Sequence, residues 1–398
     1  MNILMISDVY FPRINGVSTS IQTFRRALAA QGVASTLIAP DYPGAPPDAA
    51  ALDIVRVPSR YLPFDPEDRV MRAGAVRALT ERLRARDYDL VHIHTPFVAH
   101  YAGRALAREL GLPCISTYHT FFEEYLFHYV RFLPRAALRL LARHFTRSQC
   151  NDMDAVVVPS SAMERVLAGY GVTRPREILP TGLPAEQFVG GDGVAFRQRH
   201  GIAPDRRVLL YVGRVAHEKN IGLLIGMVDE LRESHPLALL LITGEGPAIG
   251  ALRAAVQRRR LERHVCFLGY LDRGTELHDC YRAADLFVFA SRTETQGLVL
   301  LEAMALGTPV VAIAAMGTHD ILDPQCGARI APDDTPGFAA VVRGVLDDRA
   351  GLDRMGKDAC DYARRWSADE MAARLARLYR RHANAAAQTG GSPAAQLP

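Results

Sequence analysis

Two glutamates, Glu294 and Glu302, stand eight positions apart around the expected start of a helix. Glu294 falls in the loop after a buried apolar run, where its carboxylate can reach a bound sugar. Glu302 lies about a turn and a half inside a helix that begins near Gly297. Taken alone, each acid is more simply explained as a solvated loop residue or an ordinary helix glutamate. Glu302, however, interrupts the apolar run 298–306, and a buried carboxylate needs hydrogen-bond partners such as ribose hydroxyls.

The start of this helix is itself a candidate site for an anion. The backbone N–H groups of Gly297 and Leu298 point out of the helix start, and the helix dipole favours negative charge there.

Two cations, Arg214 and Lys219, lie where a strand ends at Gly213 and a helix is expected to follow. A diphosphate leaving group needs its charge neutralised, and without a metal ion arginine and lysine side chains do this. The alternative is a surface loop in which Lys219 pairs with Glu218. A lysine at a helix N-terminus opposes the helix dipole, which favours the functional interpretation.

Together these segments resemble the signature of the family 4 retaining glycosyltransferases, which have the two-domain GT-B fold. That signature is a Glu-x7-Glu segment preceded by a Gly-Arg…Glu-Lys loop. The resemblance extends over the whole chain up to its tail. Further matching segments are 11–17, 180–182, 243–247 and 267–270.

The resemblance implies a role for each matched residue. The backbone at Gly16 approaches the donor phosphate, Glu302 binds the ribose, Glu294 binds the donor sugar, and the loop at Phe267 and Leu268 borders the base. The implied donor-binding set is Gly16, Gly213, Phe267, Leu268, Gly297, Leu298 and Glu302, and the implied catalytic set is His119, Glu294, Arg214 and Lys219.

The acceptor-domain histidine of that family corresponds to His119, at the end of an expected strand. The resemblance implies that it orients the sugar or the developing oxocarbenium. A lone histidine is usually structural, and only its place in the pattern distinguishes His119 from His92 and His94.

Short apolar runs alternate with amphipathic stretches along the chain, which predicts parallel sheets flanked by helices. We expect two doubly wound Rossmann-like domains that face a cleft, and a C-terminal helix that returns to the first domain. The expected parts are an acceptor and membrane-binding domain (1–184), a nucleotide-sugar donor domain (185–365), a crossover helix (366–384) and a disordered tail (385–398). The expected strands are 3–7, 35–39, 54–57, 90–94, 114–117 and 155–159, then 208–212, 238–243, 265–268, 286–290, 310–313 and 328–330.

Composition excludes several classes of protein. The 398 residues are 49% hydrophobic and 23% charged, which is ordinary for a globular chain, and the net charge of +4 is too weak to indicate nucleic-acid binding. The six cysteines form no Cys-x-x-Cys pair, so neither a zinc site nor a disulfide framework is expected. The N-terminus is a first strand and not a signal peptide, and no apolar run is long enough to span a membrane. We expect a cytoplasmic protein, associated peripherally with the inner face of the cell membrane.

The pair Asp152 and Asp154 matches an Asp-x-Asp metal motif of another glycosyltransferase fold. Here it precedes a strand, so it should lie away from the strand's carboxyl end and belong to a turn. We therefore expect no metal site and no cofactor besides the nucleotide-diphosphate sugar, which is a substrate. A nicotinamide enzyme is disfavoured because the first strand lacks a following Gly-x-Gly-x-x-Gly.

Five arginines recur at intervals of four in a stretch without acids, and apolar residues accompany them. On one helix they form a basic stripe suited to an anionic membrane surface. The alternative is an ordinary packed helix with solvated arginines. The arginines are Arg131, Arg135, Arg139, Arg143 and Arg147.

The segment 118–129 together with 293–297 is similar to the bacterial glucosyltransferases that act on diacylglycerol. This narrower resemblance implies transfer of glucose from UDP-glucose to a membrane lipid, with retention of the α configuration. The alternatives are a mannosyl- or other hexosyltransferase with GDP-mannose or another donor and a polyprenyl-linked, oligosaccharide or small acceptor, and a non-transferring protein of the same fold, such as a phosphorylase, an epimerase or a membrane scaffold.

Overall fold

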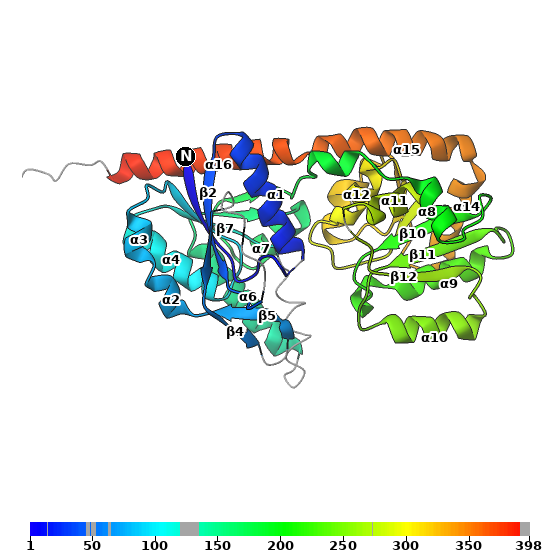
Figure 1. Cartoon of the computed structure of the whole chain (residues 1–398), viewed down its shortest axis with the longest axis horizontal. Coiled ribbons are helices and arrows are strands. Elements are labelled where there is room, and N and C mark those ends of the chain that lie inside the picture. The colour runs from blue at the N-terminus through cyan, green and yellow to red at the C-terminus, as the bar shows by residue number, and fades with distance from the viewer. Residues whose placement is uncertain are drawn as a thin grey trace, which may run out of the picture. The chain divides into compact units, whose positions relative to one another are not determined.

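The computed structural model describes residues 1–13, 15–44, 48, 53–62, 65–119, 135–272 and 274–390. The chain divides into two compact units, Met1–Gly182 with Ala368–Pro398, and Leu183–Ser367 (Figure 1). The sequence analysis set these boundaries after 184 and 365. Each unit is a parallel sheet covered by helices, which confirms the predicted fold class.

The sheet of the first unit has strand order β3-β2-β1-β6-β7-β8-β9, and each neighbouring pair is parallel. The predicted strands of this unit are all present to within one residue at each end. The strands are β1 Asn2–Ile6, β2 Ala34–Pro40, β3 Ile54–Val57, β6 Leu90–Ile93, β7 Cys114–Thr117, β8 Ala155–Val158 and β9 Arg176–Ile178.

The sequence analysis did not predict three of the strands that the structure describes. β9 is a polar three-residue edge strand, and β4 (Ser59–Leu62) pairs with β5 (Asp65–Met71) in an antiparallel hairpin outside the main sheet. None of them has the continuous apolar run of a strand that is buried on both faces.

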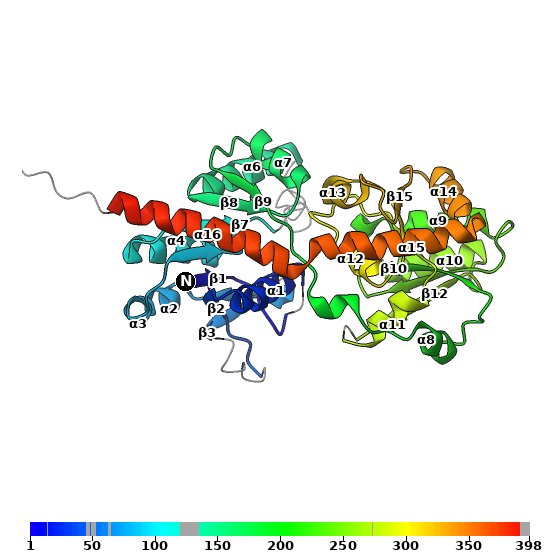
Figure 2. The same cartoon turned by 90° about the horizontal axis from the view of Figure 1, so that it is seen from above.

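Helices surround the sheet of the first unit: α1 Gly16–Ala30, α2 Ala73–Arg77, α3 Thr80–Arg84, α4 Val98–Leu110, α6 Arg135–Asn151, α7 Ser161–Gly169 and α16 Ala368–Gly390. The last of these, α16, packs beside α1, as Figures 1 and 2 show, and buries Met371, Leu375 and Tyr379 in the core of this unit. The predicted return of the C-terminal helix to the first domain is therefore confirmed.

The predicted disordered tail needs a correction. We expected disorder from residue 385, but α16 continues to Gly390. Residues 385–387 are alanines, which have the highest helix propensity and extend the helix at little cost. The helix also begins at Ala368, after a 3₁₀ turn at Arg364–Trp366, and not at 366. Residues 391–398 lie outside the described part of the chain.

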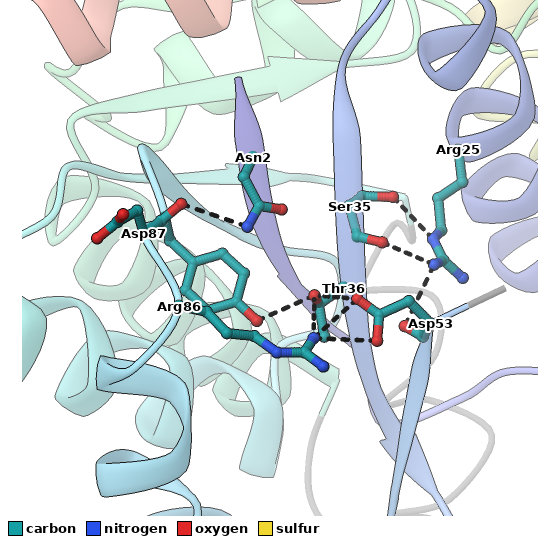
Figure 3. A network of polar contacts seen from close by, with 8 residues as sticks. Asn2, Arg25, Ser35, Thr36, Asp53, Arg86 and Asp87 are labelled. Atoms are coloured by element: carbon teal, nitrogen blue, oxygen red, sulfur yellow. Dashed lines mark hydrogen bonds and ion pairs between the residues drawn. The ribbon is translucent and has the colours of Figure 1, made fainter. Parts of the chain in front are cut away.

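A polar network joins the starts of β2 and β3 to the loop before β6 (Figure 3). Arg86 donates to both carboxylate oxygens of Asp53, at 3.0 and 2.9 Å, and Thr36 donates to Asp53 at 2.5 Å. Arg25 of α1 donates to the carbonyl of Ser35 at 2.9 Å. Strand starts form the amino-terminal edge of the sheet, opposite the edge that binds ligands in open α/β folds. We interpret this network as a stabiliser of the fold.

The sheet of the second unit has strand order β12-β11-β10-β13-β14-β15 and is also parallel. Its strands agree with the predicted ones to within one residue, because they are nearly continuous apolar runs covered on both faces. They are β10 Arg207–Val212, β11 Ala238–Thr243, β12 Val265–Gly269, β13 Leu286–Phe289, β14 Val310–Ala312 and β15 Ala328–Ile330.

The helices of the second unit are α8 Gly193–Arg199, α9 Ile221–Leu231, α10 Ile249–Arg259, α11 Glu276–Ala283, α12 Leu298–Ala305, α13 His319–Leu322, α14 Thr335–Asp347 and α15 Arg349–Ala363. The 3₁₀ turns are η2 Ala185–Phe188, η3 His217–Lys219, η4 Met316–Thr318 and η5 Arg364–Trp366. No helix in the described ranges is both long and apolar enough to cross a membrane.

Candidate donor and acceptor sites

The loops after β10 and β11 are joined by a hydrogen bond and close backbone packing at the carboxyl edge of the second sheet. Gly213 N donates to the carbonyl of Thr243 at 3.1 Å. A Cβ on Gly244, whose φ is +115°, would lie 2.1 Å from the carbonyl oxygen of Gly213, so only glycine fits there. The Tyr211 hydroxyl donates to the carbonyl of Arg214 at 3.1 Å. These backbone contacts fix the loop that carries the two predicted cations.

The structure brings Lys219 and Glu294 into direct contact. Lys219 Nζ lies 2.5 Å from Glu294 Oε1, and the two side chains are only 20% and 18% exposed. Arg214 extends further into solvent and pairs with Glu218 at 3.2 Å. The alternative pairing of Lys219 with Glu218 was therefore wrong, because the lysine reaches across to the loop after β13.

A second glycine, Gly317, packs closely against the loop that carries Glu294. Gly317 N, in η4, donates to the carbonyl of Glu294 at 2.8 Å, and a Cβ on Gly317 would lie 2.1 Å from the carbonyl oxygen of Thr295. Gly297 then caps α12 with a φ of +94°. The first N–H groups of α12 have no partner within the helix, as at any helix start, and anion binding at this end stays a prediction.

Glu302 lies inside α12 and is 6% exposed. Its carboxylate accepts a hydrogen bond of 3.0 Å from the hydroxyl of Tyr281, which is fully buried in α11. The sequence analysis expected ligand hydroxyls as the partners of this carboxylate and missed the tyrosine. The sequence indicated only that a buried Glu302 needs a hydrogen-bond partner. It did not identify Tyr281, which precedes Glu302 by 21 residues and is placed beside it by the fold.

Phe267 and Leu268 precede Gly269, the last residue of β12, and are half-buried. The guanidinium of Arg253 lies over the ring of Phe267 at 4.8 Å. Gly244 N and the Thr243 hydroxyl both donate to the carbonyl of Gly269 at 2.8 Å, which ties the end of β12 to the neighbouring strand end. No direct contact joins Phe267 to the Lys219–Glu294 pair among the described contacts.

Gly16 is the first residue of α1 in the other unit. Asn15 and Ser18 cap this helix reciprocally, and a Cβ at Gly16 would meet nothing within 4 Å. The fold therefore does not require glycine at this position, and the role of Gly16 at the donor phosphate stays a prediction.

His119 belongs to a cluster of imidazoles that sequence reasoning did not find. His119 Nε2 lies 3.2 Å from His94 Nδ1. His92 contacts the hydroxyls of Tyr379 and Thr117, both at 2.7 Å. Burial lowers the pKa of His92 to about 3 and that of His119 to about 4. The sequence signal for this cluster was the spacing of His92 and His94, because alternate residues of a strand share one face.

Helix α6 carries the predicted basic stripe. Arg139, Arg143 and Arg147 are exposed, and the guanidinium of Arg143 lies over the ring of Tyr170 at 5.3 Å. Arg131 lies outside the described residues, and Arg135 is the first residue of α6 but its side chain also lies outside what the structure describes.

The accompanying apolar residues of α6 divide between two faces. Leu138 is buried in the unit, whereas Leu140 and Leu141 are 71% and 56% exposed.

The Asp152 and Asp154 pair lies at the amino end of β8, as predicted. Asp154 accepts a hydrogen bond of 2.7 Å from Cys114 N at the start of β7. Within the described ranges, no three His, Cys, Asp or Glu side chains gather closely enough to hold a metal ion.

The chain matches known families and structures along most of its length. Residues 14–187 match the profile of Glycosyltransferase Family 4, and residues 194–362 match that of Glycosyl transferases group 1. Two alpha-monoglucosyldiacylglycerol synthases are similar to it. That of Streptococcus pneumoniae is 33% identical over 78% of this chain and 71% of its own length, and that of Acholeplasma laidlawii is 28% identical over 78% and 80%.

Sucrose-phosphate synthase from Thermosynechococcus elongatus shares the fold, with a TM-score of 0.76, 23% identity and coverage of 96% of this chain and 98% of that one. The matches to both halves of the chain lead to the same conclusion as the Glu294–Glu302 segment and the Arg214–Lys219 loop. This chain belongs to the family 4 glycosyltransferases of the GT-B fold and is a hexosyltransferase.

Proposed function

We propose that the protein transfers glucose from UDP-glucose to a hydroxyl of a membrane lipid, such as diacylglycerol or a glycolipid. The observation that carries the proposal is the Lys219–Glu294 pair beside the start of α12, in a chain similar to two alpha-monoglucosyldiacylglycerol synthases.

The pair suggests how the donor is received. Lys219 is held by Glu294 when no donor is bound, and the diphosphate competes for the same cation. Binding of the donor then frees the Glu294 carboxylate to accept hydrogen bonds from the sugar hydroxyls. Arg214, Lys219 and the N-terminus of α12 together neutralise the leaving diphosphate, so no metal ion is required.

The reaction that fits this site keeps the anomeric configuration. The bond between the sugar C1 and the diphosphate oxygen breaks, and a bond from C1 to the acceptor oxygen forms on the same face. The acceptor proton passes to the departing phosphate oxygen, since the proposal assigns no carboxylate as nucleophile. His119 orients the sugar or the developing oxocarbenium, and as a neutral imidazole it does so by hydrogen bonding.

The nucleoside part of the donor has a separate set of residues. Glu302 binds the ribose hydroxyls while Tyr281 holds its carboxylate in place. The half-buried Phe267 and Leu268 border the base, and Arg253 holds the phenyl ring from its other side.

The exposed face of α6 is the proposed membrane contact. Leu140 and Leu141 offer apolar surface, and the exposed Arg139 and Arg147 lie beside them on the same helix. An amphipathic helix with this composition binds anionic lipid by burying its apolar residues and pairing its cations with headgroups.

The test is transfer of labelled glucose to diacylglycerol in vesicles that contain anionic lipid. A thermal-shift panel of UDP, GDP and ADP sugars precedes it, because a ligand that binds the native state raises the melting temperature by mass action. Stabilisation by UDP-glucose followed by glucolipid formation supports the proposal. Stabilisation by GDP-mannose alone, or glucose transfer only to soluble acceptors, would show that the proposed donor or acceptor is wrong.

Membrane docking is tested by vesicle co-sedimentation. Arg139→Glu with Arg147→Glu should weaken binding to anionic vesicles and remove its dependence on salt, because attraction to charged headgroups decays within about 8 Å at physiological ionic strength. Leu140→Ser with Leu141→Ser should weaken binding at every salt concentration.

The matched control changes the net charge equally at exposed arginines away from α6, with Arg82→Glu on α3 and Arg258→Glu on α10. If this control reduced binding as much as the α6 variants, the docking surface would not be the exposed face of α6.

A further inference from the structure

A pocket in the first unit opens beside His119, at the carboxyl ends of β6 and β7. Its walls come from the loop after β6, the first turn of α4 and the last turns of α6. Among the residues that line it are His94, Thr95, His100, His119, Phe145 and Gln149. The pocket thus joins hydrogen-bonding side chains to an aromatic wall beside His119.

His94, one of the residues that line the pocket, has a ring nitrogen without a hydrogen-bond partner in the described part of the chain. It is 2% exposed, and that nitrogen is Nε2. Its other ring nitrogen contacts His119. A buried polar atom without a partner is costly, so a hydrogen-bonding group of a ligand at this position would be favourable.

The imidazoles of the pocket are uncharged at neutral pH. Burial lowers the pKa of His100 and of His119 to about 4, and that of His94 well below its ordinary value. A neutral imidazole donates one hydrogen bond and accepts another, as a hydroxyl also does. It offers no positive charge to a phosphate.

The N-terminus of α4 would favour an anion, but the carboxylate of Asp8 already occupies it. Asp8 accepts hydrogen bonds from Ala99 N in the first turn of α4, at 3.0 and 3.2 Å, and from the Thr95 hydroxyl at 2.8 Å. Burial raises the pKa of Asp8 to about 6, so the carboxylate is charged at pH 7 and cancels the positive end of the helix.

The other helix end at the pocket is negative. Gln149 and Cys150 line the pocket from the last turn of α6, where the helix dipole repels an anion. No lysine or arginine is among the described residues that line the pocket. A phosphate here would face the negative end of α6.

From this arrangement we infer that the pocket binds the uncharged, hydroxyl-bearing headgroup of the acceptor, and that Asp8 is a specificity residue that excludes headgroups carrying phosphate. The inference rests on the proposed lipid acceptor and narrows it to neutral lipids. His94 Nε2 hydrogen-bonds a hydroxyl of that headgroup, and Phe145 packs against its carbon atoms.

The experiment compares two acceptors in vesicles of equal phosphatidylserine content, one set with diacylglycerol and the other with phosphatidylglycerol. The unaltered protein should glucosylate diacylglycerol far faster than phosphatidylglycerol. Asp8→Asn keeps an oxygen to accept from Ala99 N but removes the charge, so it should reduce this preference by about tenfold or more. Asp53→Asn is the control, since Asp53 lies at the opposite edge of the sheet and should leave the preference unchanged.

A second variant tests the pocket without touching Asp8. His94→Gln should lower kcat/KM for diacylglycerol by about tenfold, as expected for one lost hydrogen bond, and leave the affinity for UDP-glucose unchanged. A purely structural role of His94 would instead lower the melting temperature and leave kcat/KM of the folded fraction as it was.

The outcomes separate this inference from the proposed function. Equal use of both lipids by the unaltered protein, or an unchanged preference in folded Asp8→Asn, would overturn the inference and leave the lipid acceptor standing. If Asp8→Asn does not fold, an unchanged kcat/KM in His94→Gln overturns it. If neither lipid is glucosylated although UDP-glucose binds, the proposed acceptor is wrong and the inference falls with it.

Discussion

Tyr281→Phe removes one oxygen atom from the core of the second unit and leaves the ring in place. The lost interaction is the 3.0 Å hydrogen bond from the tyrosine hydroxyl to Glu302, a carboxylate that is 6% exposed. A hydrogen bond to a charged group contributes about 1.5–3 kcal/mol net, and the carboxylate remains buried after the change. We expect the free energy of unfolding to fall by this amount, which corresponds to roughly 3–12 °C in Tm for a unit of this size.

The effect on donor binding should be smaller than the effect on stability. The bond to Tyr281 exists both with and without the donor, so its loss largely cancels in the binding equilibrium. Only the greater freedom of the Glu302 carboxylate remains, and we expect the Kd of UDP-glucose to rise by no more than about tenfold, or 1.4 kcal/mol. Glu302→Gln, which alters the ribose-binding group itself, should raise the Kd further.

Calorimetric titration with UDP-glucose and thermal unfolding followed by circular dichroism measure the two quantities. Tyr362→Phe is the matched control, because the Tyr362 hydroxyl donates to a backbone carbonyl, that of Asp320, in the same unit at 3.2 Å. It should lower stability modestly and leave the Kd unchanged. If Tyr281→Phe altered neither stability nor Kd, or if Tyr362→Phe raised the Kd equally, Tyr281 would not be what positions Glu302.

Three further predictions concern the donor site and the imidazole cluster. Arg214→Ala and Lys219→Ala should each slow transfer by about 10²–10³, as for lost transition-state donors, and full activity in assays of either variant would remove that residue from the site. Chelation with EDTA should leave the transfer rate unchanged, and a rate restored only by added Mn²⁺ or Mg²⁺ would contradict this. His92 has a folded pKa of about 3, below its ordinary 6.5, so the unfolded state protonates first and stability should be lost as the pH falls below 6.5. Urea unfolding should show a loss by pH 5 to which His92 contributes up to about 2 kcal/mol, with His94, His100 and His119 adding to it and Asp8, with its raised pKa, partly offsetting it. The loss should be smaller by about that amount in His92→Asn, and an equal loss in that variant would contradict the assignment to His92.

The sequence alone determined the local features of this protein. The main strands of both sheets were predicted from apolar runs, because a strand that is buried on both faces must be apolar along its length. The positions of Gly213 after a strand, of Gly297 at a helix start and of Glu302 inside that helix followed from the same alternation. Short or polar strands such as β9 gave no such signal, and neither did the extension of α16 through the alanines of the tail.

Only the tertiary structure decided which side chains meet. Lys219 pairs with Glu294 from 75 residues away and not with its neighbour Glu218, and His92 contacts Tyr379 across 287 residues. Local periodicity fixes which face of a strand or helix a residue occupies, but it carries no information on which distant element packs against that face. Those contacts follow from strand order and helix placement, and they turn the separate motifs of the sequence into a carboxylate–lysine pair and a cluster of neutral histidines.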